Sequence, residues 1–262
     1  MKPALFLHIQ KTAGTSVQEM ARGAYGVHNV ISHGDYVELG IDGCAAKAFV
    51  SGHFGFSFAE KLMHGRYCFT FLRDPKERII SLYNYCRRTE GMDEFIYEAA
   101  RRHNLEGFLD ELSGHEMRDR IWNNQVWQLS YGYHNELALS RRVNIGDVSS
   151  QDLLSTAKRN LDRFDYVGFV DQFDQDIQNI FKNLGRKRSK VRHANRTSPA
   201  AEISPRAKRL LSNLTVLDDE LYDYAIHNKI KSHKYTPIPY LSALVRLNKR
   251  HLRILGILGC HG

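Results

Sequence analysis

The sequence is poor in cysteine, and the cysteines that it has are far apart. Its 262 residues include 4 cysteines and no Cys-x-x-Cys pair, which excludes the closely spaced thiols of a zinc ribbon or a dithiol redox motif. Cys68 and Cys86 lie within regular apolar patterns. We therefore predict that the cysteines are reduced, buried thiols with a packing role.

Long apolar segments are also missing from the sequence. The apolar run over residues 4–9 contains His8 and is far shorter than a signal-peptide core or a membrane span. A later segment, residues 240–258, is interrupted by a polar and basic cluster at 248–251. The chain has no internal repeat, low-complexity tract or evident linker. We expect a single domain over residues 1–262, without a membrane anchor and with a cytoplasmic location, and the sequence leaves the oligomeric state open.

Acidic residues are outnumbered by basic ones. The 37 Lys and Arg residues against 29 Asp and Glu give a formal net charge of +8, and the isoelectric point is about 9.3. This charge favours an anionic partner such as a nucleotide phosphate, an acidic polysaccharide, nucleic acid or a membrane surface. No recognised nucleic-acid-binding motif accompanies the charge, so we do not expect a nucleic-acid partner.

Strand patterns and helix patterns alternate along the chain. Apolar runs predict strands over residues 4–9, 27–31, 48–51, 67–72 and 166–170. Helical spacing predicts helices that begin near Thr15, after Asp74 and after Ser204, and others over residues 92–103, 105–112, 118–129, 150–163 and 173–184. This alternation predicts an α/β fold with a central, mainly parallel sheet flanked by helices.

A polar loop separates the first predicted strand from the first predicted helix. It supplies a lysine, a glycine and three hydroxyls where the helix begins, in the run Lys11, Thr12, Ala13, Gly14, Thr15, Ser16. A phosphate bound there would meet the free N–H groups of a helix N-terminus together with a lysine. The run is therefore a candidate phosphate site, and a capped helix with a surface lysine is the alternative.

The order of residues in this loop differs from that of a nucleoside triphosphate loop. In that loop the lysine follows the second glycine and precedes a hydroxyl that serves magnesium. Here Lys11 precedes Gly14. The sequence thus indicates a phosphate loop of another kind than that of a kinase or ATPase.

A second motif follows the predicted strand over residues 67–72. Asp74, Pro75 and Glu77 form the start signal of a helix, with Asp74 as its cap. Arg73 stands just before this start, and Ser81 lies two helical turns beyond it. The forked guanidinium of Arg73 and the hydroxyl of Ser81 could hold one phosphate from two sides. Pairing of Arg73 with a nearby carboxylate is the alternative.

Together the two motifs resemble the sulfotransferase superfamily, in particular the heparan sulfate 6-O- and 2-O-sulfotransferases and their bacterial relatives. The runs His8-Ile-Gln-Lys-Thr and Phe71-Leu-Arg-Asp-Pro are especially similar to the 6-O enzymes. The resemblance covers most of residues 4–198, with weaker matches at Asn124-Gln125, Gln128-Leu129, Asn160-Leu161, Val167-Gly168-Phe169 and Phe173-Asp174. It implies a P-loop-like nucleotide-binding sulfotransferase fold.

The resemblance also implies a reaction and the roles of the two motifs. The sulfuryl group of 3'-phosphoadenosine-5'-phosphosulfate (PAPS), the co-substrate, would move to a hydroxyl acceptor, a glycan or glycoconjugate, and no metal would be required. Residues from Lys11 to Ser16 would bind the 5'-phosphosulfate, and Arg73 and Ser81 the 3'-phosphate. The loop that closes over the nucleotide in this family falls on residues 192–198.

An attacking hydroxyl has to lose its proton, and histidine is the natural base near neutral pH. The resemblance places the catalytic histidine at His53, between Gly52 and Gly55, where a predicted strand ends. His33 is the rival base, and His8 is expected to lie too close to the buried end of its strand. We expect an in-line displacement in which His53 takes the proton and Lys11 stabilises the bridging oxygen of the departing nucleotide.

Two other functions remain open from the sequence. In a nucleotide-dependent kinase, Asp74 would serve magnesium. In a non-enzymatic, basic polysaccharide-binding module, the binding residues would be Arg87, Arg88, Arg101, Arg102 and the basic loop over residues 186–196.

Overall fold

The computed structural model describes residues 1–132, 148–186 and 203–231. The chain divides into two compact units, Met1–Asp223 and Tyr224–Gly262, and all the strands described below belong to the first. The predicted extent of a single domain, residues 1–262, stays a prediction. The basic loop beyond residue 186 and the segment over 240–258 lie outside the described residues.

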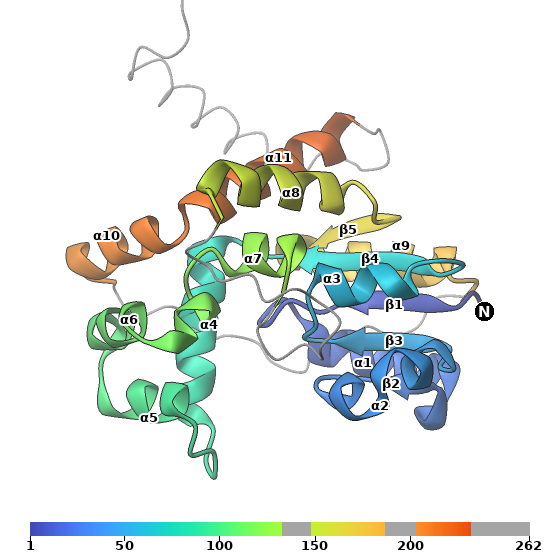
Figure 1. Cartoon of the computed structure of the whole chain (residues 1–262), viewed down its shortest axis with the longest axis horizontal. Helices are drawn as coiled ribbons and strands as arrows, with labels where there is room; N and C mark the ends of the chain where they lie inside the picture. The colour runs from blue at the N-terminus through green and yellow to red at the C-terminus, as the bar shows by residue number, and fades with distance from the viewer. Residues whose placement is uncertain (133–147, 187–202, 232–262) are drawn as a thin grey trace, which may run out of the picture. The chain divides into compact units, whose positions relative to one another are not determined.

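Five parallel strands form the centre of the first unit (Figure 1). They are β1 Ala4–Leu7, β2 Val30–Ile31, β3 Phe49–Gly52, β4 Tyr67–Leu72 and β5 Tyr166–Phe169. The sheet has the order β2-β3-β1-β4-β5, and every neighbouring pair is parallel. All four residues of the central strand β1 are buried, as its unbroken apolar run requires.

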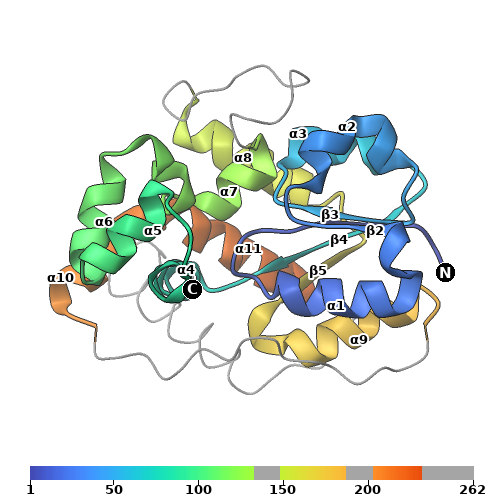
Figure 2. The same ribbon diagram turned by 90° about the horizontal axis from the view of Figure 1, so that it is seen from below.

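Helices connect and cover the strands. They are α1 Gly14–Tyr25, α2 Asp35–Ala45, α3 Phe56–Ala59, α4 Pro75–Arg88, α5 Phe95–Arg102, α6 Leu105–Ser113, α7 Asn124–Ser130, α8 Ser150–Leu161, α9 Phe173–Asn183, α10 Pro205–Leu214 and α11 Val216–Lys231. Figure 2 shows α1 and α9 on one face of the sheet and α2 and α3 on the other. The predicted α/β fold with a central parallel sheet flanked by helices is confirmed.

The loops that leave β1 and β3 run to helices on opposite faces of the sheet (Figure 2). β1 leads to α1, and its sheet neighbour β3 leads to α3. Such a reversal of connections opens a crevice at the carboxyl ends of the two strands, where α/β proteins bind their ligands. The fold therefore predicts a site at the residues that follow Leu7 and Gly52.

Two predicted helix starts are confirmed by their caps. The carboxylate of Asp74 accepts a hydrogen bond from the Glu77 N–H at 2.9 Å, and the hydroxyl of Ser204 accepts one from the Ala207 N–H at 3.1 Å. The carboxylate of Glu77 is paired with Arg73 at 3.5 Å. The alternative partner that the sequence suggested for Arg73, a nearby carboxylate, is therefore present.

Two predicted elements differ in the structure. Residues Val27–Asn29 form a 3₁₀ turn, so only Val30–Ile31 of the expected strand joins the sheet. The helix predicted over 118–129 is broken, because Glu116–Arg120 is a 3₁₀ turn and Asn123 has a left-handed backbone with φ 40° just before α7.

The described cysteines are free and buried, as predicted. Burial raises the pKa of Cys44 to about 11 and that of Cys68 and Cys86 to about 12, so these thiols are protonated near neutral pH. Cys260 lies outside the described residues. Within residues 1–132, 148–186 and 203–231, no helix combines the length and apolar character needed to cross a membrane.

Candidate active site

The two sequence motifs meet at the carboxyl edge of the sheet. β1, β3 and β4 are neighbours in the parallel sheet, so the residues that follow them emerge side by side. Nη1 of Arg73, after β4, donates to the main-chain oxygen of Lys11, after β1, at 3.4 Å. The two motifs, 62 residues apart, are therefore parts of one site.

The loop after β1 has a strained backbone. Lys11 and Ala13 both have left-handed φ values, 68° and 67°, which non-glycine residues adopt at a free-energy cost and mostly at functional sites. The hydroxyl of Thr12 is buried and donates to the carbonyl of Ile9 at 2.8 Å. The side chain of Thr12 thus holds the loop in shape, and what it can offer a ligand is its main chain.

The N-terminus of α1 lies at the end of this loop. The helix begins at Gly14, and the residue before it, Ala13, provides no side-chain cap. A helix start without a side-chain cap presents N–H groups to an anion. Thr15 is exposed and Ser16 is buried, so their hydroxyls differ in access to solvent. The described geometry suits the predicted phosphate loop.

Lys11 lies over an aromatic ring. Its Nζ is 3.9 Å from the centroid of the Tyr85 ring, on the last turns of α4. Burial lowers the pKa of Lys11 to about 8. The neighbouring Cys86 raises this pKa, and the charges of Arg73 and Arg88 lower it. Lys11 is therefore mainly cationic near pH 7, but its charge is more weakly held than that of an exposed lysine.

Arg73 and Ser81 lie on the same segment, at the start of α4 and inside it. The side chain of Arg73 is 12% exposed, and its contacts with Lys11 and Glu77 are long, 3.4 and 3.5 Å. Ser81 is buried, and within the described parts of the chain its hydroxyl has no hydrogen-bond partner. Both side chains are thus able to take up an anionic ligand without losing a strong contact.

His53 is held in one tautomer. It follows β3, and its Nδ1 lies 3.0 Å from the main-chain oxygen of His8. A carbonyl only accepts, so Nδ1 carries the proton and Nε2 keeps its lone pair. Burial lowers the pKa of His53 to about 4. The hydrogen bond to His8 raises this pKa, and the charges of His33, Arg120 and Lys11 lower it. Near neutral pH the ring is therefore a neutral base.

The structure brings three histidines together. The ring centroid of His53 is 4.3 Å from that of His8 and 5.5 Å from that of His33. His33 is exposed, whereas burial is the main cause that keeps the pKa of His8 well below its usual value. Both His8 and His53 are thus neutral near pH 7, and His33 remains the more accessible neighbour.

The ring of His8 also covers the start of α1. A Cβ atom at Gly14 would lie 1.7 Å from Nε2 of His8, so only glycine leaves room for that ring. From the sequence, His8 was expected to lie too close to the buried end of its strand. Because β1 ends at Leu7, His8 lies beyond the strand, between the candidate phosphate loop and His53. The sequence did not reveal this position because the predicted strand extended to residue 9.

A buried glutamine connects the loops on either side of His53. Nε2 of Gln128, on α7, donates to the main-chain oxygens of His8 at 3.1 Å and of Phe54 at 2.9 Å. The His8 carbonyl orients the His53 ring. Phe54 is the residue that follows His53 in the chain. The sequence showed Gln128 only as a weak family match, because nothing local reveals which carbonyls it reaches.

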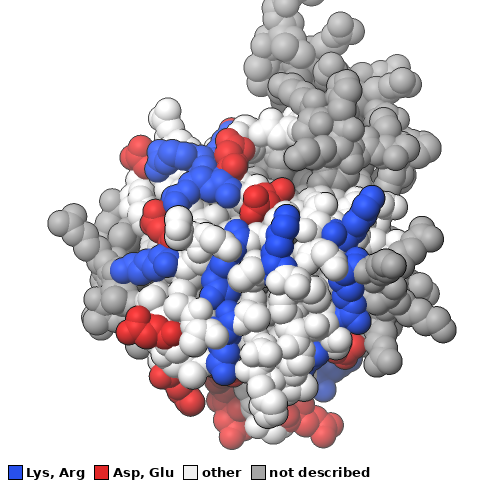
Figure 3. Space-filling model, turned by 90° about the vertical axis from the view of Figure 1, so that its right-hand side faces the viewer, with Lys and Arg blue, Asp and Glu red and all other residues white. Residues whose placement is uncertain are grey.

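The residues of the two alternative functions are engaged elsewhere. Asp74 caps α4, and among the described residues no group of three or more His, Cys, Asp or Glu side chains is arranged for a metal ion. The four arginines of α4 and α5 have nearby partners: Arg87 with Tyr83, Arg88 with Asn84, Arg101 with Thr89 and Met92, and Arg102 with Glu111. On the side of the molecule where the strands begin, Lys and Arg side chains lie among uncharged and acidic residues (Figure 3).

Comparison with known proteins agrees with this geometry. No curated protein matches the chain. A family model described as the sulfotransferase family matches residues 2–225, which include all five strands, both motifs and the three histidines. The chain therefore belongs to the sulfotransferase family.

Proposed function

We propose that this sulfotransferase uses PAPS as its sulfuryl donor and a hydroxyl of a carbohydrate as its acceptor, with His53 as the base. Membership of the family makes the chain a transferase of sulfuryl groups, and PAPS is the donor that the family generally uses. The carbohydrate acceptor is supported by the resemblance of both motifs to the 6-O enzymes and by the positive net charge. A cytoplasmic location stays a prediction.

The observation that carries this proposal is the contact between Arg73 and the Lys11 carbonyl. PAPS has an anionic group at each end of its nucleoside, the 5'-phosphosulfate and the 3'-phosphate. The joined motifs offer one cationic group for each: Lys11 with the N-terminus of α1, and Arg73 with Ser81. Neither motif alone would distinguish PAPS from other nucleotides.

The proposed reaction is an in-line displacement at sulfur. The acceptor oxygen forms a bond to sulfur while the bond from sulfur to the bridging phosphate oxygen breaks, which leaves adenosine 3',5'-bisphosphate (PAP). The proton of the acceptor hydroxyl passes to Nε2 of His53, whose lone pair is free because Nδ1 donates to His8. The Lys11 ammonium stabilises the charge on the leaving oxygen. The residues supply these contributions without a metal ion.

The kinase and binding-module alternatives are less well supported. The Asp74 carboxylate already caps α4, and the arginines proposed for a polysaccharide-binding module are bonded to neighbouring groups. A module of that kind would also keep its ligand when Lys11 and Arg73 are both replaced.

A transfer assay tests the proposal. PAPS with labelled sulfur is incubated with the protein and a panel of glycans and small alcohols, and the label in each acceptor is measured with and without a metal chelator. We expect transfer to at least one glycan, unaffected by the chelator and absent from the Lys11→Ala, Arg73→Ala double variant. Transfer only to small alcohols would overturn the carbohydrate acceptor, and absence of transfer together with equal binding of ATP and PAP would overturn the donor.

A further inference from the structure

We infer that Gln125 is a positioning residue for nucleotide recognition: its carboxamide fixes the main chain of Arg73, and the paired N-termini of α7 and α11 fix the carboxamide. This inference rests on the proposed role of Arg73 at the 3'-phosphate. It concerns the main chain of Arg73, which would not itself contact the ligand.

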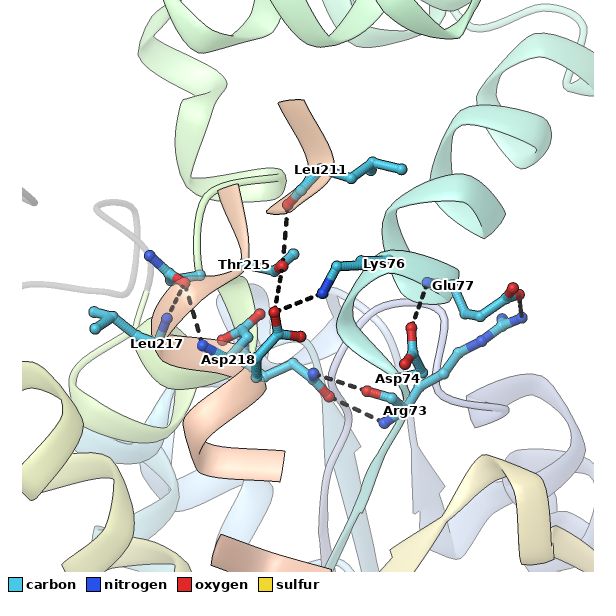
Figure 4. A network of polar contacts seen from close by, with 11 residues as sticks. Arg73, Asp74, Lys76, Glu77, Leu211, Thr215, Leu217 and Asp218 are labelled. Atoms are coloured by element: carbon cyan, nitrogen blue, oxygen red, sulfur yellow. Dashed lines mark hydrogen bonds and ion pairs between the residues drawn. The ribbon is translucent and has the colours of Figure 1, made fainter. Parts of the chain in front are cut away.

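The Gln125 carboxamide forms two hydrogen bonds with the main chain of Arg73. Nε2 of Gln125 donates to the Arg73 carbonyl at 2.9 Å, and the Arg73 N–H donates to Oε1 of Gln125 at 3.1 Å (Figure 4). Gln125 is 1% exposed, so this pair is shielded from water. A carboxamide offers a donor and an acceptor side by side, which match the C=O and the N–H of a single residue.

The pair lies where the sheet ends. The last paired residue of β4 is Leu72, opposite Phe169 of β5. Arg73 is the next residue, and Asp74 then caps α4. Gln125 thus provides the hydrogen bonds that a strand neighbour would provide, at the residue where the strand gives way to the helix.

The position of Gln125 is fixed by reciprocal caps. The carboxylate of Asp218, on the first turn of α11, accepts from the N–H groups of Gln125 at 3.2 Å and Val126 at 2.8 Å. Oδ1 of Asn123, just before α7, accepts from the N–H groups of Leu217 at 2.8 Å and Asp218 at 3.2 Å. Two N–H groups at the start of each helix are therefore capped by a side chain from the start of the other, and Figure 4 shows the bonds from Leu217 and Asp218.

The same region is tied to the start of α4. Nζ of Lys76 lies 2.6 Å from Oδ2 of Asp219, and the Thr215 hydroxyl lies 3.0 Å from the same oxygen. The main chain of Arg73, before Asp74, is thus attached to α7, and the side chain of Lys76, after it, is attached to α11. In contrast, the contacts of the Arg73 guanidinium within the described residues are the two long ones, with the Lys11 carbonyl and Glu77.

This contrast suits a phosphate-binding arginine. An arginine that binds phosphate with two hydrogen bonds needs a fixed main chain and a guanidinium that is free to contact the ligand. A displacement of about 1 Å at a positioned group can cost about a hundredfold in rate. Loss of the Gln125 carboxamide should therefore weaken recognition of the 3'-phosphate and leave recognition of the 5' end intact.

The test compares two nucleotides that differ only at the 3' position. Isothermal titration calorimetry gives the Kd of PAP and of adenosine 5'-monophosphate, which lacks the 3'-phosphate, for the wild type and for Gln125→Met and Gln125→Glu. Methionine keeps the length without hydrogen bonds, and glutamate keeps the acceptor but sets a carboxylate against the Arg73 carbonyl. The matched control is Gln175→Met, an exposed glutamine on α9.

We expect both Gln125 variants to bind PAP at least about tenfold more weakly, with an unchanged Kd for the monophosphate, while Gln175→Met binds both nucleotides as the wild type does. In an Arg73→Ala background, Gln125→Met should have no further effect. An equal loss for both nucleotides, or no loss for either, would overturn the inference. If Gln125→Met fails to fold, Gln125→Glu gives the same comparison. A wild type that does not prefer PAP would instead refute the proposed donor.

Discussion

His53 and His8 are joined by one hydrogen bond that sets the chemistry of the ring, since Nδ1 of His53 lies 3.0 Å from the His8 carbonyl. Gln128 donates to the same carbonyl, so the acceptor that orients the ring is itself held in place. The ring plane and the tautomer of His53 are thus determined by the main chain that leaves β1. The three histidines need not be equivalent even though their rings are close.

Replacement of His53 separates chemistry from nucleotide binding. His53→Ala should bind PAP with nearly the wild-type Kd and lower kcat by about a hundredfold or more, the usual contribution of a general base. Steady-state kinetics and calorimetry measure the two quantities. The control is His33→Ala, which removes the exposed neighbour. Near-normal turnover in His53→Ala, with an inactive His33→Ala that still binds PAP, would assign the base to His33.

The pH dependence of kcat at saturating PAPS should reflect two shifted groups. The lowered pKa of His53, about 4, keeps the base neutral, so activity should fall only as the pH drops toward 4 and not near 6.5. Lys11, with a pKa of about 8, loses its charge above that pH, and activity should fall again on the alkaline side.

The donor phosphate also titrates, near pH 6, which affects PAPS binding on the acid side, so kcat at saturating PAPS is the quantity to follow. A variant identifies the group behind the alkaline limb. In Lys11→Arg the side chain stays cationic throughout the range, and the decline near pH 8 should disappear. An unchanged alkaline limb in this variant would show that another group causes it.

Gly14→Ala tests the contact between the phosphate loop and His8. The new Cβ would overlap the His8 ring, so that ring and the neighbouring His53 have to move. We expect weaker PAP binding and lower kcat together. The matched control is Gly23→Ala in the same helix, where the nearest atom is 4.0 Å away; it should leave activity unchanged and stabilise the protein by about 0.4–1 kcal/mol. Wild-type kinetics in Gly14→Ala would contradict the described packing.

Ligand-induced stabilisation should follow the 3'-phosphate. PAP without added metal should raise the Tm of the protein much more than ATP with magnesium, because Arg73 and Ser81 meet a group that ATP lacks. Arg73→Ala should weaken PAP binding by about 1.5–3 kcal/mol, the contribution of a charged hydrogen bond. Thermal denaturation with each ligand provides the measurement, and equal shifts for the two nucleotides would contradict the assignment.

Local signals predicted the elements that local contacts stabilise. The strand Tyr67–Leu72 and the start of α4 at Pro75 agree with the sequence prediction, because an apolar run and an N-cap are both visible within a few residues. Helix α2 was not anticipated, since Gly40, with φ 63°, kinks it and obscures its periodicity. The start of α7 was misplaced because its cap is Asp218, 92 residues from Val126.

The same distinction holds for the site. The loop from Lys11 to Ser16, and Arg73, could be singled out from residue types next to predicted strand ends, whereas the role of His53 was predicted from the family resemblance. The contacts made by Gln125, Gln128 and His8 depend on which main-chain carbonyls the fold brings near, and sequence spacing carries no such information. The residues proposed for the chemistry could therefore be named from the sequence, whereas the residues that orient them could not.

The reciprocal caps of α7 and α11 make the donor site sensitive to the order of synthesis. A nascent chain that has emerged only as far as α10 already contains every strand of the sheet and both motifs. It still lacks Asp218, so the N–H groups of Gln125 and Val126 at the start of α7 have no cap, and Gln125 is held less firmly. During translation the sheet can thus form first, and full affinity for the 3'-phosphate should be acquired only when the ribosome has released the first turn of α11.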